Sequence, residues 1–181
     1  MTNTELEQLK YPIGKLELPS EITKDHIANW ISILEHFPDH IEHLVENLTD
    51  EQLDTPYRPE GWTIRQVIHH LADSHHHSYT RFKWASTENT PVIKAYDEQL
   101  WAELIDAKTA PIEMSLNYLR ALHFKLVYFL KTMSIDDFNK SFIHPEGNVT
   151  VSLKQNVANY AWHSQHHYAH IEKALQKNGW K

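Results

Sequence analysis

Histidine is the residue type in this sequence with the clearest capacity for chemistry. The 181-residue chain contains 15 histidines, and nine of them fall in two short windows, residues 69–77 and 163–170. Imidazole is a common metal ligand and can act as a general base near neutral pH. The chain has no cysteine, which excludes disulfides, a cysteine nucleophile, cysteine-ligated zinc and iron–sulfur clusters. The composition therefore favours metal binding or acid–base chemistry by imidazole.

His163 and His167 have the spacing of two ligands of one metal ion. Residues four apart on a helix have Cβ atoms ~5–6 Å apart, so both imidazoles can reach a cation at ~2.0–2.1 Å. A third nitrogen would come from His70 on a facing helix. Because no fourth ligand is evident, the remaining position would be open, which is typical of catalytic sites. A divalent cation there lowers the pKa of a bound water or activates a thiolate.

Other interpretations of the histidines stay open. His166 and His170 form a competing pair with the same spacing, although we expect His166 to point toward solvent. On the earlier helix, we expect His69 and His76 to point away from the core. Such pairs also occur by chance in a chain rich in histidine. The absence of His-Glu-x-x-His argues against a zincin-type protease, and the absence of Glu-x-x-His on the long helices argues against a di-iron bundle.

Asp73 and His77 are the candidate catalytic residues beside these ligands. His77 could act as a general acid or base and Asp73 could orient a nucleophile; the competing explanation is a solvated helix charge and an exposed histidine. Three arginines flank the same helix and either hold substrate carboxylates or serve at the surface: Arg58, Arg65 and Arg81.

Four long amphipathic segments must position these side chains. Apolar residues recur at helical spacing over about 23–48, 63–86, 111–133 and 152–177, with Pro38 predicting a kink or break in the first. Residues 63–66 and 152–155 have the pattern of capping boxes, and so have residues 49–52, which predict a short helix ending before Pro56. Residues 1–22 contain prolines and a glycine and are predicted to form an extended arm.

Two long connections join the later helices. Residues 87–110 are predicted to hold a short helix around 97–105, and residues 142–151 could form a small β-hairpin. Four helices with such connections predict an all-α fold, a four-helix bundle with crossovers. We find no internal repeat or domain boundary, so residues 1–181 are expected to form a single domain.

Charge and hydropathy exclude several classes of partner. Lys and Arg number 17 and Asp and Glu number 24, giving a formal net charge of −7, which argues against nucleic-acid and anionic-membrane binding. No apolar run approaches the ~20 residues of a membrane span. The first ten residues lack the apolar core of a signal peptide, so a cytoplasmic location is expected.

Two long motifs stand out in the sequence: residues 53–75, which include Gly-Trp-Thr-Ile-Arg-Gln-Val-Ile-His-His, and residues 160–171. They resemble the signatures of the YfiT family, a branch of the DinB superfamily of metal-binding four-helix bundles. Shorter matches are residues 11–14, residues 96–98 with Trp101, and the pair His144-Pro145. His76, His77 and Gln165 stand at positions where the family pattern does not demand them, which leaves a catalytic role for His77 undecided.

The resemblance implies one divalent metal per chain, held by His70, His163 and His167. Zinc or nickel is expected, although ligation by imidazoles alone also suits iron and copper. The resemblance also implies a metal-dependent hydrolase or a thiol S-transferase that uses bacillithiol, acting on a small-molecule substrate, and it implies a homodimer. The alternative is a non-catalytic metal- or ligand-binding bundle that serves in a stress response.

Overall fold

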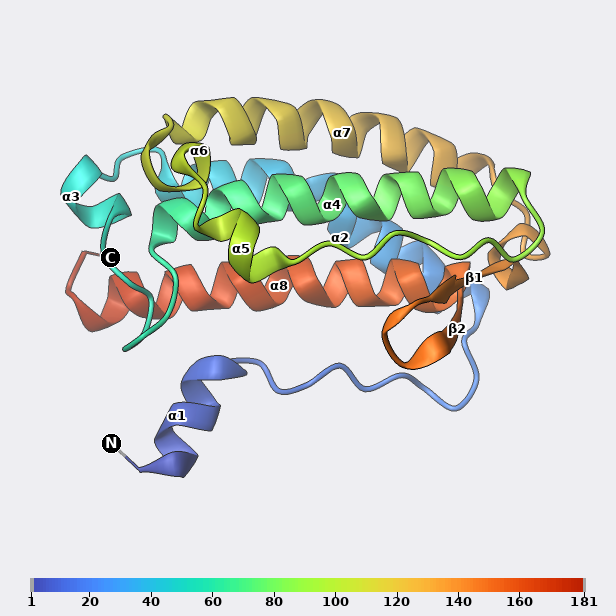
Figure 1. Cartoon of the computed structure of the whole chain (residues 1–181), viewed down its shortest axis with the longest axis horizontal. Coiled ribbons are helices and arrows are strands. Elements are labelled where there is room, and N and C mark those ends of the chain that lie inside the picture. The colour runs from blue at the N-terminus through green and yellow to red at the C-terminus, as the bar shows by residue number, and fades with distance from the viewer. Residues whose placement is uncertain (1, 181) are drawn as a thin grey trace.

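Four long helices form the body of the protein in the computed structural model, which describes residues 2–180. They are α2 (Lys24–Val45), α4 (Ile64–Thr87), α7 (Ile112–Thr132) and α8 (Leu153–Lys177), and they lie side by side along the long axis (Figure 1). Helix α4 packs against α7 and α8, and α2 packs against the same two helices. The predicted four-helix bundle is therefore confirmed.

The helices begin where the sequence offers capping boxes. At Thr49, Thr63 and Ser152, the cap side chain accepts a hydrogen bond from the third residue of the helix, whose glutamine side chain bonds back to the cap. This arrangement satisfies backbone N–H groups that have no partner within the helix. Helix α2 starts in the same way at Thr23, and it continues through Pro38 without a break.

The connections differ in detail from the expectation. The link between α4 and α7 holds two short helices, α5 (Glu98–Ala102) and α6 (Ile105–Thr109), in place of one, and α3 (Asp50–Leu53) precedes α4. The expected hairpin is present: β1 (Ser141–His144) pairs antiparallel with β2 (Val149–Ser152). Short 3-10 turns lie at Asp137–Asn139 and Glu146–Asn148, and the hairpin turns at Gly147, whose φ of 73° suits glycine.

The N-terminal segment corrects the prediction of an extended arm over residues 1–22. Residues Asn3–Lys10 form a helix, α1, because Thr2 and Glu5 make a complete capping box, and only the segment after it is extended. The arm lies along α8 and is fastened there by hydrogen bonds to its backbone carbonyls. Trp162 Nε1 donates to Gly14 O at 3.3 Å, and Lys173 Nζ donates to Pro12 O at 2.8 Å.

The core consists of two apolar clusters with a layer of buried polar residues between them. One cluster includes Phe37, Leu71 and Ile171, and the other includes Leu34, Phe82 and Val157. His75 lies between the clusters, with its ring 5.8 Å from that of Phe37 and 5.1 Å from that of Tyr160. None of the helices within residues 2–180 is long and apolar enough to cross a membrane.

Candidate metal centre

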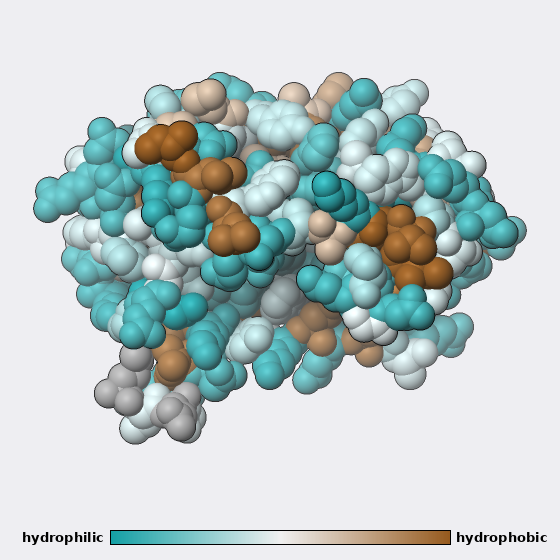
Figure 2. Space-filling view, viewed as in Figure 1, coloured by the Kyte–Doolittle hydropathy of each residue, from teal (hydrophilic) through white to brown (hydrophobic). Residues whose placement is uncertain are grey.

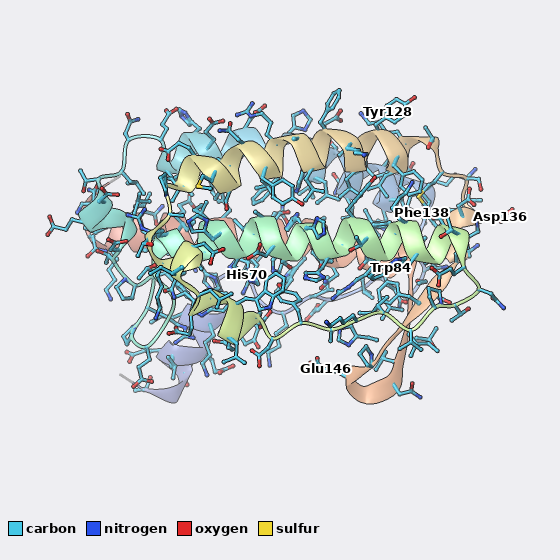
Figure 3. The ribbon with its side chains drawn as sticks, turned by 45° about the horizontal axis from the view of Figure 1, so that its top comes forward. His70, Trp84, Tyr128, Asp136, Phe138 and Glu146 are labelled. Carbon is cyan, nitrogen blue, oxygen red and sulfur yellow. The ribbon has the colours of Figure 1, made fainter. Side chains whose placement is uncertain are left out.

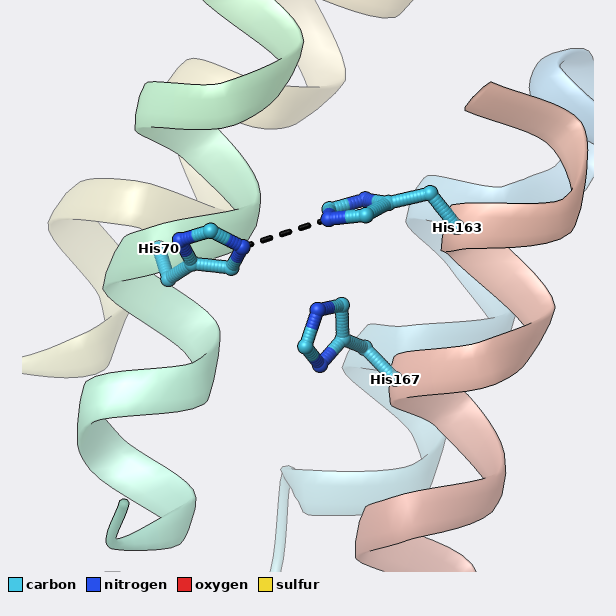
Figure 4. Close-up of side chains that lie close together, drawn as sticks. All are labelled: His70, His163 and His167. Atoms are coloured by element: carbon cyan, nitrogen blue, oxygen red, sulfur yellow. Dashed lines mark hydrogen bonds between the residues drawn. The ribbon is translucent and has the colours of Figure 1, made fainter. Parts of the chain in front are cut away.

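Three imidazoles from α4 and α8 converge on one point. The Nε2 atoms of His70 and His163 are 3.2 Å apart, and a ring nitrogen of His167 points toward the gap between them (Figure 4). The ligand nitrogens of these three residues lie within 4.8 Å of one another. Two nitrogens bound at ~2.05 Å to one tetrahedral ion lie about 3.3 Å apart. The separation of His70 and His163 is therefore that of two ligands of one metal, and the side-chain set fits a divalent cation.

Burial keeps these rings neutral, as metal binding requires. Desolvation lowers the pKa of His70 to about 4, with a further contribution from His166. Desolvation, assisted by the neighbouring histidines, also holds the pKa of His163 and of His167 well below the usual value. At neutral pH the three rings are therefore neutral, and each keeps one nitrogen lone pair.

A chain of hydrogen bonds through the core fixes which nitrogen of His163 faces the centre. His123 Nδ1 lies 2.6 Å from Leu34 O, His123 Nε2 lies 2.7 Å from His75 Nδ1, and His75 Nε2 lies 3.2 Å from His163 Nδ1. Because a carbonyl only accepts, His123 must donate through Nδ1. A neutral imidazole carries one N–H, so His75 donates to His123, and His163 donates through Nδ1 to His75. His163 Nε2 is thus left with a free lone pair.

We call this series of hydrogen bonds the core chain (His163, His75, His123 and Leu34 O). Pro38 explains why the carbonyl oxygen of Leu34 is free to accept a hydrogen bond from His123. In an α-helix the carbonyl of residue 34 would accept a hydrogen bond from the N–H of residue 38. Proline has no N–H, so the Leu34 carbonyl lacks its partner within α2. His123 supplies the missing donor from α7. Pro38, which the sequence pattern marks as a possible helix breaker, therefore leaves free the carbonyl at which the core chain ends.

A second chain, the arm chain (His167, His170 and Lys10 O), orients His167. His170 Nε2 is 3.0 Å from Lys10 O, and His170 Nδ1 is 3.4 Å from His167 Nδ1. The same reasoning makes His170 donate to the carbonyl and accept from His167. His167 is thereby protonated on Nδ1, and its Nε2 lone pair is free. Hydrogen bonds of this kind orient metal-binding histidines and raise their basicity.

His163 lines two separate cavities. The first has a volume of about 330 Å³ and is walled by aromatic rings and imidazoles, including Trp62, Trp162 and His166. The second, of about 570 Å³, lies between α4, α8, the segment before α5 and the hairpin. Figure 2 shows the middle of this face hollowed and bordered by hydrophilic side chains, and Figure 3 shows Glu146 at the tip of the hairpin and His70 on α4. A substrate thus has room on either side of His163.

The structure does not bring Asp73 or His77 to the three ligands. Neither lines the two cavities that His163 lines. Desolvation raises the pKa of Asp73 to about 6, with a contribution from Asp106 of α6. The ring of His77 is stacked on Tyr96 at 4.2 Å, and desolvation lowers its pKa to about 4. Their catalytic role stays a prediction without support from the geometry.

Two histidines expected at the surface are buried. His69 was expected to face away from the core, but it packs against α7, with Nδ1 2.7 Å from Ser115 Oγ and Nε2 3.2 Å from Ala110 O. His166 was expected to face solvent, but it lies under the N-terminal arm, stacked on Trp162 at 4.4 Å. His69 is covered by α7 and the end of the connection before it, and His166 is covered by the arm, whose Tyr11 ring lies 5.9 Å from its own. His76 is exposed, as expected.

Sequence reasoning missed several residues of the site. His123 is a single histidine on α7 with no motif around it, and its pairing with His75 depends on how the helices align. Glu98 lines both cavities, and its pKa is raised chiefly by desolvation and also by Glu146 and Asp97. Its only sequence signal was the short match at residues 96–98.

Comparisons with known proteins agree with this architecture. The family model described as the DinB superfamily matches residues 33–171. The chain is 46% identical over 172 residues to a Bacillus subtilis protein provisionally named metal-dependent hydrolase YfiT, covering 95% of this chain and 97% of the relative. A relative from Oceanobacillus iheyensis with the same provisional activity is 47% identical over 171 residues, covering 94% and 98%.

A solved structure supports the same assignment. The structure of YfiT from Bacillus subtilis, described as having an unusual four-helix bundle topology, matches with a TM-score of 0.94 and 45% identity. The match covers 96% of this chain and 99% of that one. The protein therefore belongs to the YfiT family of the DinB superfamily.

Proposed function

We propose that the protein is a metal-dependent hydrolase that binds one divalent cation through His70, His163 and His167. The observation that carries the proposal is that these three neutral imidazoles converge beside two cavities, so that a bound ion could meet both its ligands and a substrate. The relatives' provisional names point to the same reaction class. Three imidazoles suit zinc or nickel.

Side chains beside the metal ligands would transfer the proton and limit the access of water. A divalent cation in such a site supplies Lewis acidity and activates a coordinated nucleophile. Glu98 lines both cavities and has a raised pKa, and in this proposal it would accept a proton from the nucleophile and return it to the leaving group. Trp62 packs on His70 with its ring centroid 4.7 Å away and shields that ligand from bulk water.

The test is metal-dependent turnover. Protein prepared without an affinity tag would be loaded with zinc or nickel and assayed on a panel of esters and amides, with His163→Ala as the metal-binding control. The same preparations would be offered bacillithiol with an electrophile. Hydrolysis that requires both the cation and His163 supports the proposal. Conjugation of the thiol without hydrolysis would replace it with S-transfer, and stoichiometric metal without any turnover would replace it with a binding function.

A further inference from the structure

Helix α4 carries two buried arginines that differ in their partners. Arg65 is 5% exposed, and its guanidinium is paired with Asp54 at 2.6 Å and with Asp50 at 2.7 Å. Arg81 is 9% exposed, yet no carboxylate of residues 2–180 lies within salt-bridge distance of it. Its Nη1 donates to Tyr160 Oη at 3.4 Å, and its Nε is buried without a hydrogen-bond partner.

An unpaired buried guanidinium requires an explanation. Arginine keeps its charge in proteins, and a charge removed from water without an opposite charge is costly. Arg81 lies in the half of α4 nearer its C-terminus. It lines the 570 Å³ cavity together with His163. The Arg81 side chain therefore borders the same cavity as a metal ligand.

From this geometry we infer that Arg81 forms a subsite for a carboxylate group of the substrate, deep in the second cavity and beside the metal centre. The substrate class is a small organic molecule with one carboxylate, whose reacting bond lies toward His163. Guanidinium N–H groups on adjacent nitrogens can bind the two oxygens of a carboxylate together. The assignment of this substrate class rests on the proposed function, whereas the subsite itself does not.

The rest of the cavity wall favours a carboxylate over a more highly charged anion. Tyr96 and Asn159 add neutral polar groups near the guanidinium, whereas three exposed acidic residues line the same cavity: Asp97, Glu98 and Glu146. A dianionic phosphate would meet stronger repulsion from these three groups than a monoanion. A cationic or neutral group on the substrate is instead compatible with the acidic edge.

The experiment measures binding of N-acetylglycine and of its uncharged amide, N-acetylglycinamide, to zinc-loaded and metal-free protein. Calorimetry gives the affinity, and the ¹⁵Nε resonance of Arg81 reports the contact. We expect the carboxylate to shift this resonance in both forms and Arg81→Met to weaken its binding by about 10-fold to 100-fold, the range of a charge-assisted hydrogen bond. Arg58→Met, which alters the first cavity, is the matched control and should leave this affinity unchanged.

Several results would overturn the subsite. The subsite would be rejected if the acid and the amide bound equally well, or if binding of the acid required the metal. Tighter binding of inorganic phosphate than of the carboxylate would also reject it. The melting temperature separates binding from structure: Arg81→Met should keep it or raise it, whereas Arg65→Met should lower it. A lower melting temperature for Arg81→Met would mean that the guanidinium is structural. Carboxylate binding without hydrolysis would leave the subsite standing and reject only the proposed function.

Discussion

Two chains of hydrogen bonds orient the metal ligands of α8: the core chain orients His163 and the arm chain orients His167. They differ in the position of the backbone carbonyl at which each one ends. The core chain ends on Leu34 O inside the bundle, and its histidines His75 and His123 are 0% and 1% exposed. The arm chain ends on Lys10 O, in a segment outside the bundle that is fastened to α8 by a few hydrogen bonds. The core chain is therefore enclosed by the four helices, whereas the arm chain depends on the attachment of a peripheral segment.

The largest expected loss of metal affinity comes from removing one of the metal ligands on α8. His167→Ala should weaken binding of zinc or nickel by more than about 100-fold, beyond the range for residues that only support ligands. His166→Ala is the matched control, because this neighbour lines the first cavity without belonging to the three-histidine cluster. Elemental analysis after dialysis measures the outcome. Equal metal content in the two variants would show that the ligand set is wrong.

Disruption of the core chain should cause the second-largest loss of metal affinity. His123→Leu removes the acceptor of His75 Nδ1, so His75 is no longer fixed in the tautomer that accepts the Nδ1 proton of His163. We expect metal affinity to fall by about 10-fold to 100-fold, as measured by competition with a chelator. His69→Leu replaces another buried histidine, one bonded to Ser115 and Ala110, and should lower stability without changing metal affinity. Similar losses of affinity in both variants would reject the core chain.

The arm chain should have a smaller effect. His170→Leu frees the Nδ1 proton of His167 from its partner, and we expect affinity to fall by about 10-fold or less, because the contact at 3.4 Å is the longest in either chain. Removing the first ten residues takes away the acceptor Lys10 O and should give a similar decrease while the bundle stays folded. An unchanged affinity in both variants would mean that the arm plays no part in metal binding.

The pH dependence of stability tests the core chain without any metal. Burial lowers the pKa of His123 to about 4, against about 6.5 in the unfolded chain. Between these values the unfolded state binds more protons, so the stabilisation is present above pH ~6.5 and is lost as pH falls toward ~4, by up to about 1.4 kcal/mol per pH unit. Denaturant titrations of metal-free protein should show a shallower pH dependence for His123→Leu than for wild type. Identical slopes would contradict this assignment.

The sequence was sufficient to predict the features that depend on local pattern. Capping boxes and helical periodicity indicated the four long helices, and the four-residue spacing on α8 together with His70 indicated the three ligands. The orientation of His69 could not be predicted in this way, because every residue from Ile64 to Ala72 is buried. Other elements surround this part of α4, so a single apolar stripe does not describe its environment.

The features that sequence reasoning missed depend on contacts between segments far apart in the chain. In the core chain, His75 and His123 are separated by 48 positions in the sequence, and His123 and Leu34 are separated by 89. The contrast between Arg65 and Arg81 also rests on which carboxylates approach each guanidinium. Such contacts follow from how the helices align, and no motif in one segment reveals the alignment.

The protonation state of the ligand rings tests the central claim most directly. Long-range ¹H–¹⁵N spectra of metal-free protein at neutral pH distinguish the protonated from the unprotonated nitrogen of each imidazole. For both His163 and His167, we expect a proton on Nδ1 and an unprotonated Nε2, with the Nε2 signals alone moving strongly when zinc is added. A bare Nδ1 and a protonated Nε2 on either ring, or zinc-induced shifts centred on Nδ1, would contradict this claim.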